Sequence, residues 1–146
     1  NGEGTIDGSC NWGAIASFSV WLQHCRQVNS GQQPQRVASS TYFVQSPAQG
    51  ALVGMVDIRH SLNKAQYPYG HIGYSVVPSQ RGRGLATQIL AFALARAGEL
   101  GIQSPLLCCY EHNLASRRVI EKNGLRQVGR YAEKSTGRMV LMYTQS

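Results

Sequence analysis

The sequence contains no apolar run close to the roughly 20 residues that a membrane-spanning helix needs. Its start also lacks the basic stretch followed by an apolar stretch that is typical of a secretory signal. These two absences predict a cytoplasmic protein with no membrane partner. The chain begins at Asn1 rather than Met, and residues 1–12 are rich in glycine with little periodicity. We therefore expect one domain over residues 1–146 with an incomplete N-terminal region, where its first strand and helix would lie.

Metal-binding patterns are also missing. None of the four cysteines has the two-residue spacing of a zinc knuckle, and the four histidines, at positions 24, 60, 71 and 112, are scattered. We predict no metal. Cys108 and Cys109 are adjacent inside an apolar stretch, residues 106–110, which is typical of a buried strand. We expect buried free thiols there, not disulfides.

Acidic residues are scarce, with 7 Asp and Glu against 14 Lys and Arg and a net charge of +7. Such an excess favours an anionic partner, which can be nucleic acid, an acidic membrane or a phosphorylated cofactor. Several basic residues lie beside two motifs rich in glycine and asparagine, not in one basic run: Arg81, Arg83, Arg117, Arg118 and Lys122. This distribution favours a small ligand that carries phosphate. The chain also lacks the basic helix or interleaved aromatic and basic residues of a nucleic-acid-binding domain, so we expect no nucleic-acid partner.

Periodicity predicts an α/β chain. Apolar residues at steps of three and four predict helices over residues 14–28 and from about Gly84 to Leu100, and a shorter helix is expected over residues 115–123. Strands are predicted over residues 41–44, 52–58, 71–77, 105–110, 125–130 and 138–144, the first two as an antiparallel hairpin. Residues 30–35 and 61–69 are expected to be loops, because they are polar and contain proline.

A glycine turn, residues 79–87, stands between a strand that ends at Val77 and the long helix. Its central residues are Gly82, Arg83 and Gly84. Glycine lets the backbone turn tightly and approach a ligand, and a helix N-terminus adds unpaired N–H donors with partial positive charge. The turn is therefore a seat for an anion, and a diphosphate fits it, with the charges of Arg81 and Arg83 and the hydroxyl of Thr87 beside it.

Three families use such a seat. The dinucleotide fingerprint would need a third glycine where Thr87 stands, and the P-loop needs a Gly-Lys pair that this chain lacks. What remains is Gln or Arg, two residues, Gly, one residue, Gly or Ala, which is matched by Arg81, Gly84 and Ala86. In this the chain resembles the GNAT superfamily of N-acetyltransferases.

A second segment carries the same resemblance. Residues 113–125 have an Asn and a Ser that open a helix, and the helix ends in Glu-Lys-x-Gly before a strand, as in the superfamily's other signature. Residues 57–63 followed by residues 70–74 are similar to one group of uncharacterised bacterial predicted acetyltransferases.

The resemblance implies a central mixed, mostly antiparallel sheet that is splayed at the cofactor site and flanked by helices. It implies acetyl-CoA as cosubstrate, transfer of its acetyl group to a primary amine of a small molecule or peptide by direct attack on the thioester, and it allows a homodimer. The backbone of Ser75, Val76 and Val77 would pair with the pantetheine arm. The pyrophosphate would be held by Arg81, Gly82, Arg83, Gly84, Leu85, Ala86 and Thr87. Asn113 and Ser116 would contact the arm from the other side, although ordinary helix capping suits them equally.

Acetyl transfer requires a neutral amine, so a base must remove a proton. His71 is the first candidate, because an imidazole titrates near neutral pH and because several superfamily members carry a catalytic glutamate at this place on the strand. Glu111, at the end of the next strand, is the second. The resemblance places the N–H that holds the thioester oxygen at Val77.

The acid that protonates the departing thiolate is open. Many superfamily members have a tyrosine where this chain has Ile120, so Tyr110 or Tyr131 would substitute, or no acid is needed. Arg59 and His60 are candidates for binding the acceptor substrate, or for ordering the loop that follows them. The missing tyrosine also supports an alternative function, a non-catalytic acetyl-CoA-binding sensor or assembly module.

Overall fold

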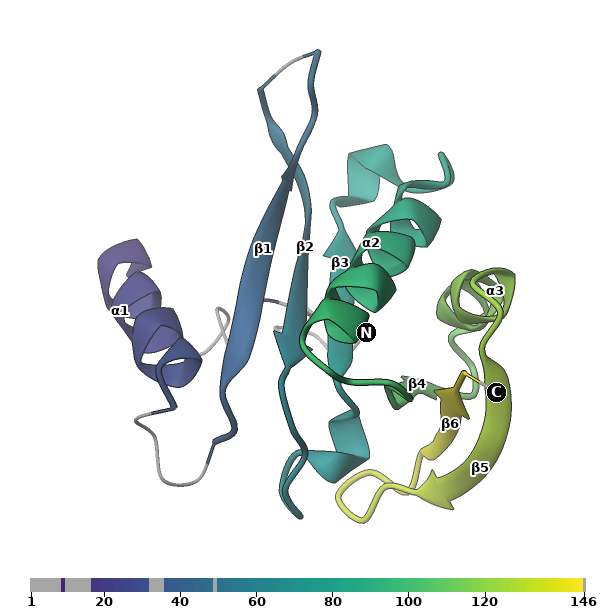
Figure 1. Cartoon of the computed structure of the whole chain (residues 1–146). Coiled ribbons are helices and arrows are strands. Elements are labelled where there is room, and N and C mark those ends of the chain that lie inside the picture. Colours follow the sequence, from purple (N-terminus) through teal and green to yellow (C-terminus); the bar gives the residue numbers. More distant parts are fainter. Residues whose placement is uncertain (1–8, 10–16, 32–35, 49, 146) are drawn as a thin grey trace.

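The computed structural model describes residues 9, 17–31, 36–48 and 50–145. These residues form three α-helices and six strands (Figure 1). In chain order they are α1 (Phe18–Asn29), β1 (Ser39–Gln45), β2 (Leu52–Arg59), β3 (Ile72–Val76), α2 (Leu85–Glu99), β4 (Leu107–Tyr110), α3 (Leu114–Lys122), β5 (Arg126–Ala132) and β6 (Met139–Thr144). Short 3-10 turns lie at Tyr67–Tyr69 and Pro78–Gln80. The predicted helices and strands are confirmed, with ends shifted by a few residues.

Part of the sequence-based expectations falls outside the described residues. The glycine-rich segment 1–12, except Ser9, lies outside them, and so do the first residues of the helix expected over 14–28 and most of the loop expected over 30–35. None of the described helices combines the length and the apolar character that crossing a membrane requires.

The strands form two three-stranded sheets, in the orders β1-β2-β3 and β4-β6-β5. Every pairing inside them is antiparallel, including the predicted hairpin of β1 and β2. A single bridge, between Gly70 and Leu107, joins the two sheets at the start of β3 and β4. The predicted α/β fold, with a mostly antiparallel sheet that splays between two strands, is confirmed.

One face of the first sheet is covered by α2, which lies in front of β2 and β3 in Figure 1. Side chains alternate between the two faces of a strand, so Val56 and Ile58 of β2 share a face with Ile72 of β3. These residues are almost fully buried and pack against the apolar side of α2. The α2 residues in this core are Ile89, Leu90, Ala93 and Ala97.

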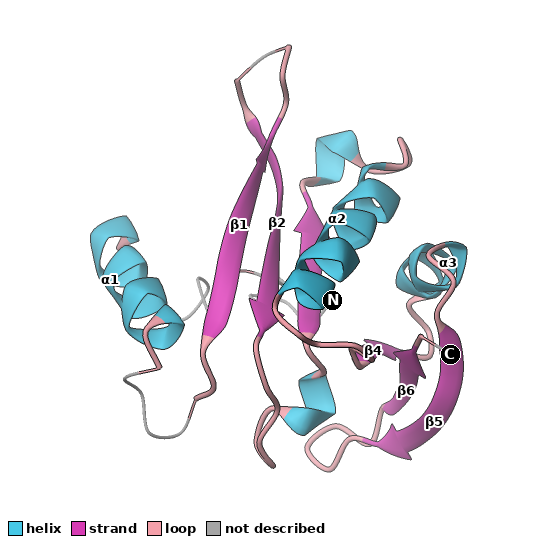
Figure 2. Cartoon of the chain, in the orientation of Figure 1, coloured by secondary structure: helices cyan, strands magenta, loops and turns pink. Residues whose placement is uncertain are grey.

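On the opposite face α1 packs against β1, beside which it lies in Figure 2. Trp21 of α1 packs edge-on against Phe43 of β1, with 5.5 Å between ring centroids, and Met55 of β2 lies against the same cluster. The indole Nε1 donates a hydrogen bond to the carbonyl of Ser9 at 2.7 Å. Ser17 caps the helix by accepting a hydrogen bond from the N–H of Val20.

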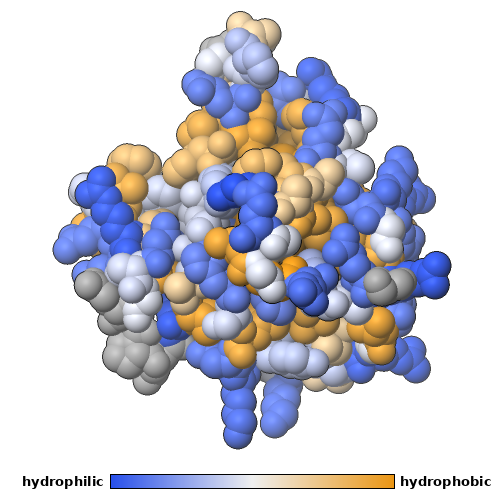
Figure 3. Space-filling model, in the orientation of Figure 1, coloured by the Kyte–Doolittle hydropathy of each residue, from blue (hydrophilic) through white to orange (hydrophobic). Residues whose placement is uncertain are grey.

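The face of the molecule in Figure 3 has hydrophilic side chains around its rim and apolar areas among them. An apolar area lies in the upper middle of that view, over the β1–β2 hairpin and α2. Exposed apolar residues of these elements include Leu52 and Phe92. The apolar side chains of the core thus lie between the layers, and the splay between β3 and β4 is the place where the two sheets separate.

Candidate active site

The two sheets are tied together tightly at one end of the splay. The N–H of His71 donates to the carbonyl of Leu106 at 2.6 Å, and the N–H of Leu106 donates to Nδ1 of His71 at 2.9 Å. Gly70 has φ +70°, and a Cβ at this position would lie 2.4 Å from the Leu106 carbonyl oxygen. Only glycine fits there, because other residues are strained at this φ and have no room for a side chain. We call the contact of Gly70 and His71 with Leu106 the joint.

Beyond the joint, β3 and β4 share no further pairing, and one edge of β3 faces the gap. The N–H of Val77 donates to the carbonyl of Val53 at 3.0 Å, and the carbonyl of His71 accepts from Arg59. The backbone N–H and C=O groups of successive residues point to opposite edges of an antiparallel strand. The backbone groups of Gly73 and Ser75 therefore also point to β2, and the backbone groups of Tyr74 and Val76 point to the gap. The expectation that Val77 offers its N–H to a thioester oxygen is therefore wrong, since that N–H is already bonded to Val53. The expected pairing of Ser75 and Val77 with the pantetheine arm is wrong for the same reason, and of the three predicted residues only Val76 has backbone groups that face the gap.

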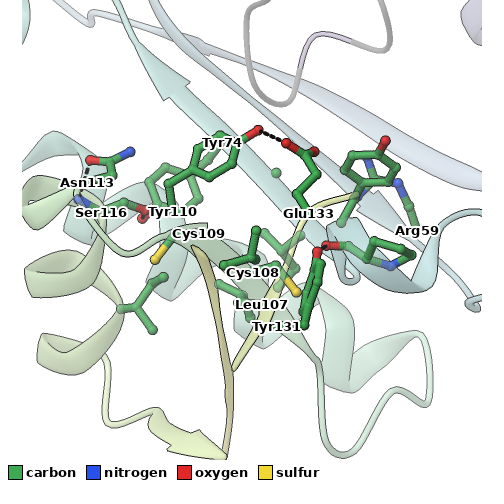
Figure 4. Close-up of a pocket in the computed structure, with 16 residues that line it drawn as sticks. Arg59, Tyr74, Leu107, Cys108, Cys109, Tyr110, Asn113, Ser116, Tyr131 and Glu133 are labelled. Atoms are coloured by element: carbon green, nitrogen blue, oxygen red, sulfur yellow. Dashed lines mark hydrogen bonds between the residues drawn. The ribbon is translucent and has the colours of Figure 1, made fainter. Parts of the chain in front are cut away.

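A cavity of about 370 Å³ fills the gap between β3 and β4. Figure 4 shows its labelled side chains, with Asn113 and Ser116 on the left and Arg59 on the right. The residues that line it are Arg59, Pro68, Tyr69, Ile72, Gly73, Tyr74, Leu107, Cys108, Cys109, Tyr110, Asn113, Ser116, Ile120, Tyr131, Glu133 and Val140. The cavity therefore combines aromatic walls with a small number of polar groups, as small-molecule sites do.

The glycine turn lies at the end of β3, at the start of α2. Gly82 and Gly84 have φ +75° and +79°, and a Cβ on either would meet no atom within 4 Å. No side chain caps α2, whereas α1 and α3 have Ser17 and Asn113 as caps. The N–H groups of Leu85 and Ala86 at the start of α2 therefore have no side-chain cap, and uncapped donors at a helix N-terminus can bind an anion.

The two arginines of the turn have different surroundings. Arg81 is exposed, but its Nε donates to the carbonyl of Val76 at 3.1 Å, which fixes the turn to the end of β3. Arg83 is exposed and bonds to the side chain of Gln80 at 3.2 Å. The carbonyl of Thr87 accepts from Asn123 at 3.2 Å, so the end of α3 is tied to the start of α2.

The N-terminus of α3 faces the cavity from the other sheet. Asn113 caps this helix, because its Oδ1 accepts from the N–H of Ser116 at 3.1 Å. The hydroxyl oxygens of Ser116 and Tyr74 are 3.0 Å apart and share a hydrogen bond across the gap. Ile120, one helical turn after Ser116, is 1% exposed and belongs to the core. Asn113 is thus both a helix cap and a lining residue.

A carboxylate lies on the wall formed by β4 and the end of β5. The Tyr110 hydroxyl donates to Oε2 of Glu133 at 3.1 Å, and the Thr136 hydroxyl donates to the same oxygen. Burial, followed by the bond to Glu133, raises the pKa of Tyr110, so this phenol stays protonated at neutral pH. The Arg138 guanidinium carbon lies 5.7 Å from the centre of the Tyr110 ring.

Glu133 was missed by the sequence analysis. The predicted strand ended at Arg130, so the residue fell outside it. Strand alternation was the available signal, since Tyr131 and Glu133 both line the cavity and Ala132, between them, does not. Tyr69 and Tyr74 were missed as well, and nothing in the local pattern separates them from the other tyrosines of the chain.

The two predicted bases lie away from the cavity lining. His71 belongs to the joint, where burial and then the charge of Arg59 lower the pKa of its imidazole, against the Leu106 hydrogen bond that raises it. Glu111 is exposed, and its backbone N–H pairs with Met139. Neither is among the lining residues.

The other predicted residues divide between the cavity and its surroundings. Arg59 lines the cavity, and its guanidinium donates to the Gly70 carbonyl at 2.8 Å, which orders the end of the loop. His60 does not line it and pairs with the Ser40 hydroxyl at 2.8 Å. Tyr131 lines the cavity and donates to the Pro68 carbonyl at 2.6 Å.

The described cysteines are free thiols, as predicted. Cys25 is buried, but Cys108 and Cys109 are only partly buried and line the cavity, so the expectation of full burial is wrong for these two. Burial raises the pKa of Cys108 to about 12 and that of Cys109 to about 11, the latter against a hydrogen bond with Ser116. Within the described part of the chain, no three His, Cys, Asp or Glu residues are grouped to hold a metal ion.

Comparison with known proteins gives a consistent result. The model of the acetyltransferase (GNAT) family matches residues 11–125. A GnaT-family protein from Bordetella pertussis is 20% identical, with a TM-score of 0.67 over 90% of this chain and 78% of that one. RimL, a ribosomal L7/L12 alpha-N-protein acetyltransferase solved with coenzyme A, is 19% identical, with a TM-score of 0.70 over 92% and 76% of the two chains.

A variant of the spermidine N-acetyltransferase SpeG from Vibrio cholerae is 17% identical, with a TM-score of 0.65 over 94% of this chain and 86% of that one. At such identities the likeness is one of fold. No curated protein sequence matches the chain.

Proposed function

The chain belongs to the acetyltransferase (GNAT) family, and we propose from this premise that it transfers the acetyl group of acetyl-CoA to a primary amine of a small molecule or peptide. The observation that carries the proposal is the splay of β3 from β4, which holds a cavity of about 370 Å³ and has an uncapped helix N-terminus at the end of β3. One extended ligand with an anionic end fits both features.

The residues of the turn fit a pyrophosphate. Gly82 and Gly84 leave open space where a side chain would stand, and the N–H groups of Leu85 and Ala86, in the first turn of α2, need acceptors from outside the helix. Arg81 adds positive charge. Arg83 and Thr87 would supply further donors at the same end.

The gap-facing edge of β3 fits an extended arm. Tyr74 and Val76 present backbone groups to the gap, and an added chain pairs with a strand edge through such groups. Asn113 has its side-chain oxygen in the cap of α3, and its amide nitrogen can donate to a carbonyl of the arm. In this proposal Ser75 and Val77 support the edge from the β2 side, and Ser116 contacts the arm from α3.

Acetyl-CoA supplies an activated acetyl thioester, and the protein must deliver a neutral amine to it. We place the proton acceptor at Glu133, the carboxylate that lines the cavity, with Tyr110 as the relay. The amine gives a proton to the Tyr110 oxygen while the Tyr110 proton passes to Glu133, and the neutral amine attacks the carbonyl carbon. His71 holds the joint in this scheme, and Glu111 is a surface carboxylate.

The departing sulfur needs little help, because a thiolate derived from a thiol of pKa about 8.5 leaves readily. The hydroxyl pair of Tyr74 and Ser116 lies beside Ile120 and can hold a proton near that sulfur. A sensor that binds acetyl-CoA without transfer is the second candidate, supported by the apolar, buried Ile120 where a hydroxyl acid would stand. Cytoplasmic location and homodimer assembly stay predictions.

The test combines binding and turnover. Calorimetry should show acetyl-CoA binding by the parent chain, and release of free thiol should rise when a suitable amine is added. Glu133→Gln should keep acetyl-CoA binding and lose about a hundredfold or more in kcat at neutral pH, while Glu111→Gln should match the parent. Binding without any amine-stimulated thiol release would favour the sensor, and full activity of Glu133→Gln would remove the assignment of the base.

A further inference from the structure

Two opposite charges face the same cavity without neutralising each other. Arg59, the last residue of β2, and Glu133, just after β5, both line it. Among the residues that the structure describes, the only salt bridge joins Arg96 and Glu99 on α2. Arg59 and Glu133 are therefore not paired, and each presents its charge to whatever occupies the cavity.

Hydrogen bonds hold the Arg59 and Glu133 side chains in place, and each side chain still has donors or acceptors that can bind a ligand. Arg59 is half-buried and donates one hydrogen bond to the Gly70 carbonyl. A guanidinium has five N–H donors, so others can bind a ligand. Glu133 takes the hydroxyls of Tyr110 and Thr136 on Oε2, and its Oε1 can accept from an ammonium group. Both side chains are thus oriented before a ligand arrives.

The charges of Arg59 and Glu133 both affect the pKa of residues that lie on the cavity wall. Burial raises the pKa of the Cys108 thiol to about 12, and the charge of Arg59 opposes this rise. Burial raises the pKa of Tyr131 to about 12, and Cys108 and Glu133 contribute to that rise. Cys108 and Tyr131 thus connect the positive side of the cavity with the negative side, and Tyr69 and Tyr110 complete an aromatic surface near Glu133.

The charged residues of the cavity favour some candidate acceptor amines over others. A polyamine or an aminoglycoside carries several positive charges, and Glu133 is the only carboxylate among the lining residues. Arg59 would repel a second ammonium group, and Arg138 lies over Tyr110 at the same wall. The net charge of +7 disfavours polycations further.

We propose, on the basis of the acetyl transfer proposed above, that the acceptor is a free amino acid, with Glu133 binding its ammonium group and Arg59 its carboxylate. Arg59 then acts as a specificity-determining residue. Its bond to Gly70 fixes the guanidinium at the end of the cavity away from Asn113 and Ser116, as Figure 4 shows. The ammonium group lies between this anchor and the end of the cavity that would take the cofactor.

The experiment compares matched acceptors by thiol release at saturating acetyl-CoA. The set contains free L-amino acids, the corresponding amino acid amides, two ω-amino acids and spermidine. For the parent, kcat/KM of the best amino acid should exceed that of its amide by at least about tenfold, mainly through KM, since the amide lacks the carboxylate that Arg59 would bind. Equal rates for the pair, or spermidine as the best acceptor, would overturn the proposal.

Variants assign the effect to Arg59. In Arg59→Gln the amino acid should lose about tenfold or more in kcat/KM and the amide should be unchanged, so that the preference disappears. Arg59→Lys should keep part of the preference, and Arg26→Gln, an exposed arginine on α1, should keep all of it. If Arg59→Gln slows both acceptors equally, Arg59 only orders the loop and the assignment is wrong.

The two proposals fail in different ways. Thiol release driven by amides or polyamines but not by amino acids overturns the acceptor proposal and keeps acetyl transfer. Acetyl-CoA binding without stimulation by any amine overturns both.

Discussion

The two ends of the gap between β3 and β4 are built in opposite ways. At the joint, Gly70 and His71 make close backbone and side-chain contacts with Leu106, and no room is left for a Cβ. At the other end, Gly82 and Gly84 have the same kind of backbone conformation but open space in front of them. The same residue type therefore serves close packing at one end and access for a ligand at the other.

This difference explains how β3 and β4 stay separated over part of their length. Separating two strands leaves backbone groups without partners, which is unfavourable unless water or a ligand pairs with them. The joint keeps β3 and β4 together where they start, and α2 and α3 are tied to each other through Asn123 and Thr87. The edge of β3 stays accessible between these two ties.

The largest effect is expected at the open end, from Gly84→Glu. A non-glycine residue at φ +79° costs about 1–2 kcal/mol, and the new carboxylate would repel the pyrophosphate. We expect the Kd for acetyl-CoA to rise by about a hundredfold or more, measured by calorimetry. Gly98→Glu, at an exposed position near the other end of α2, is the matched control and should bind like the parent. Unchanged binding by Gly84→Glu would mean that the turn does not hold the cofactor.

Gly70→Ala tests the joint. Its Cβ would lie 2.4 Å from the Leu106 carbonyl oxygen, so the two sheets must shift. We expect the free energy of unfolding to fall by about 2–4 kcal/mol, measured with denaturant. Gly98→Ala meets no atom within 4 Å and should instead raise it by up to about 1 kcal/mol. Equal small effects of the two changes would contradict the tight packing of the joint.

His71 gives the joint a dependence on pH. Its pKa is lowered in the folded chain, so between that value and about 6.5 the unfolded chain binds more protons. Stability from this group is complete above about pH 6.5 and decreases as the pH falls. His71→Ala should cost about 1–3 kcal/mol at pH 7.5, because the N–H of Leu106 loses its acceptor.

His71→Asn is the control, since its oxygen can replace Nδ1 as an acceptor but does not titrate. It should retain much of the stability at pH 7.5 and show a flatter profile than the parent below about pH 6.5. Parallel stability profiles of the parent and the Asn variant over this range would show that His71 does not titrate as the joint requires.

The last prediction concerns the reactivity of the thiols on the cavity wall, not stability or cofactor binding. A rise of the pKa of Cys109 from 9.0 to about 11 lowers its thiolate fraction at pH 8 by about a hundredfold, and Cys108 is lowered further. Both should react with iodoacetamide at least about a hundredfold more slowly in the folded chain than after unfolding, as mass spectrometry can follow. Fast alkylation of the folded chain would mean that the gap is wider and wetter than described.

Sequence patterns predict the glycine turn and the cap of α3 because both features are local. Gly82 and Gly84 have positive φ at the start of α2, and Asn113 caps α3 at a residue three positions away, so a short pattern indicates these conformations. Their contacts with the cofactor stay predictions. The charged residues of the cavity come from segments far apart in the chain, with Arg59 at the end of β2 and Glu133 just after β5. Their proximity follows from the register and the splay of two sheets, which no local pattern reveals.

The contact that His71 makes also could not be predicted from the local sequence. Its residue type and its place at the start of β3 suited a base. Its imidazole instead meets Leu106, a contact between residues 35 positions apart. An imidazole is suited to act as a base, but in the fold that of His71 accepts a hydrogen bond from the N–H of Leu106.

Amide hydrogen exchange with and without acetyl-CoA tests the central claim most directly, because it reports on each backbone N–H at both ends of the gap. The account predicts that the amides of Tyr74, Val76, Leu85 and Ala86 exchange at least about tenfold more slowly when acetyl-CoA is bound. The amide of Val77, already bonded to Val53, should change little. Bound acetyl-CoA with no protection at these four amides, or with protection only in α1 and β1, would contradict the account.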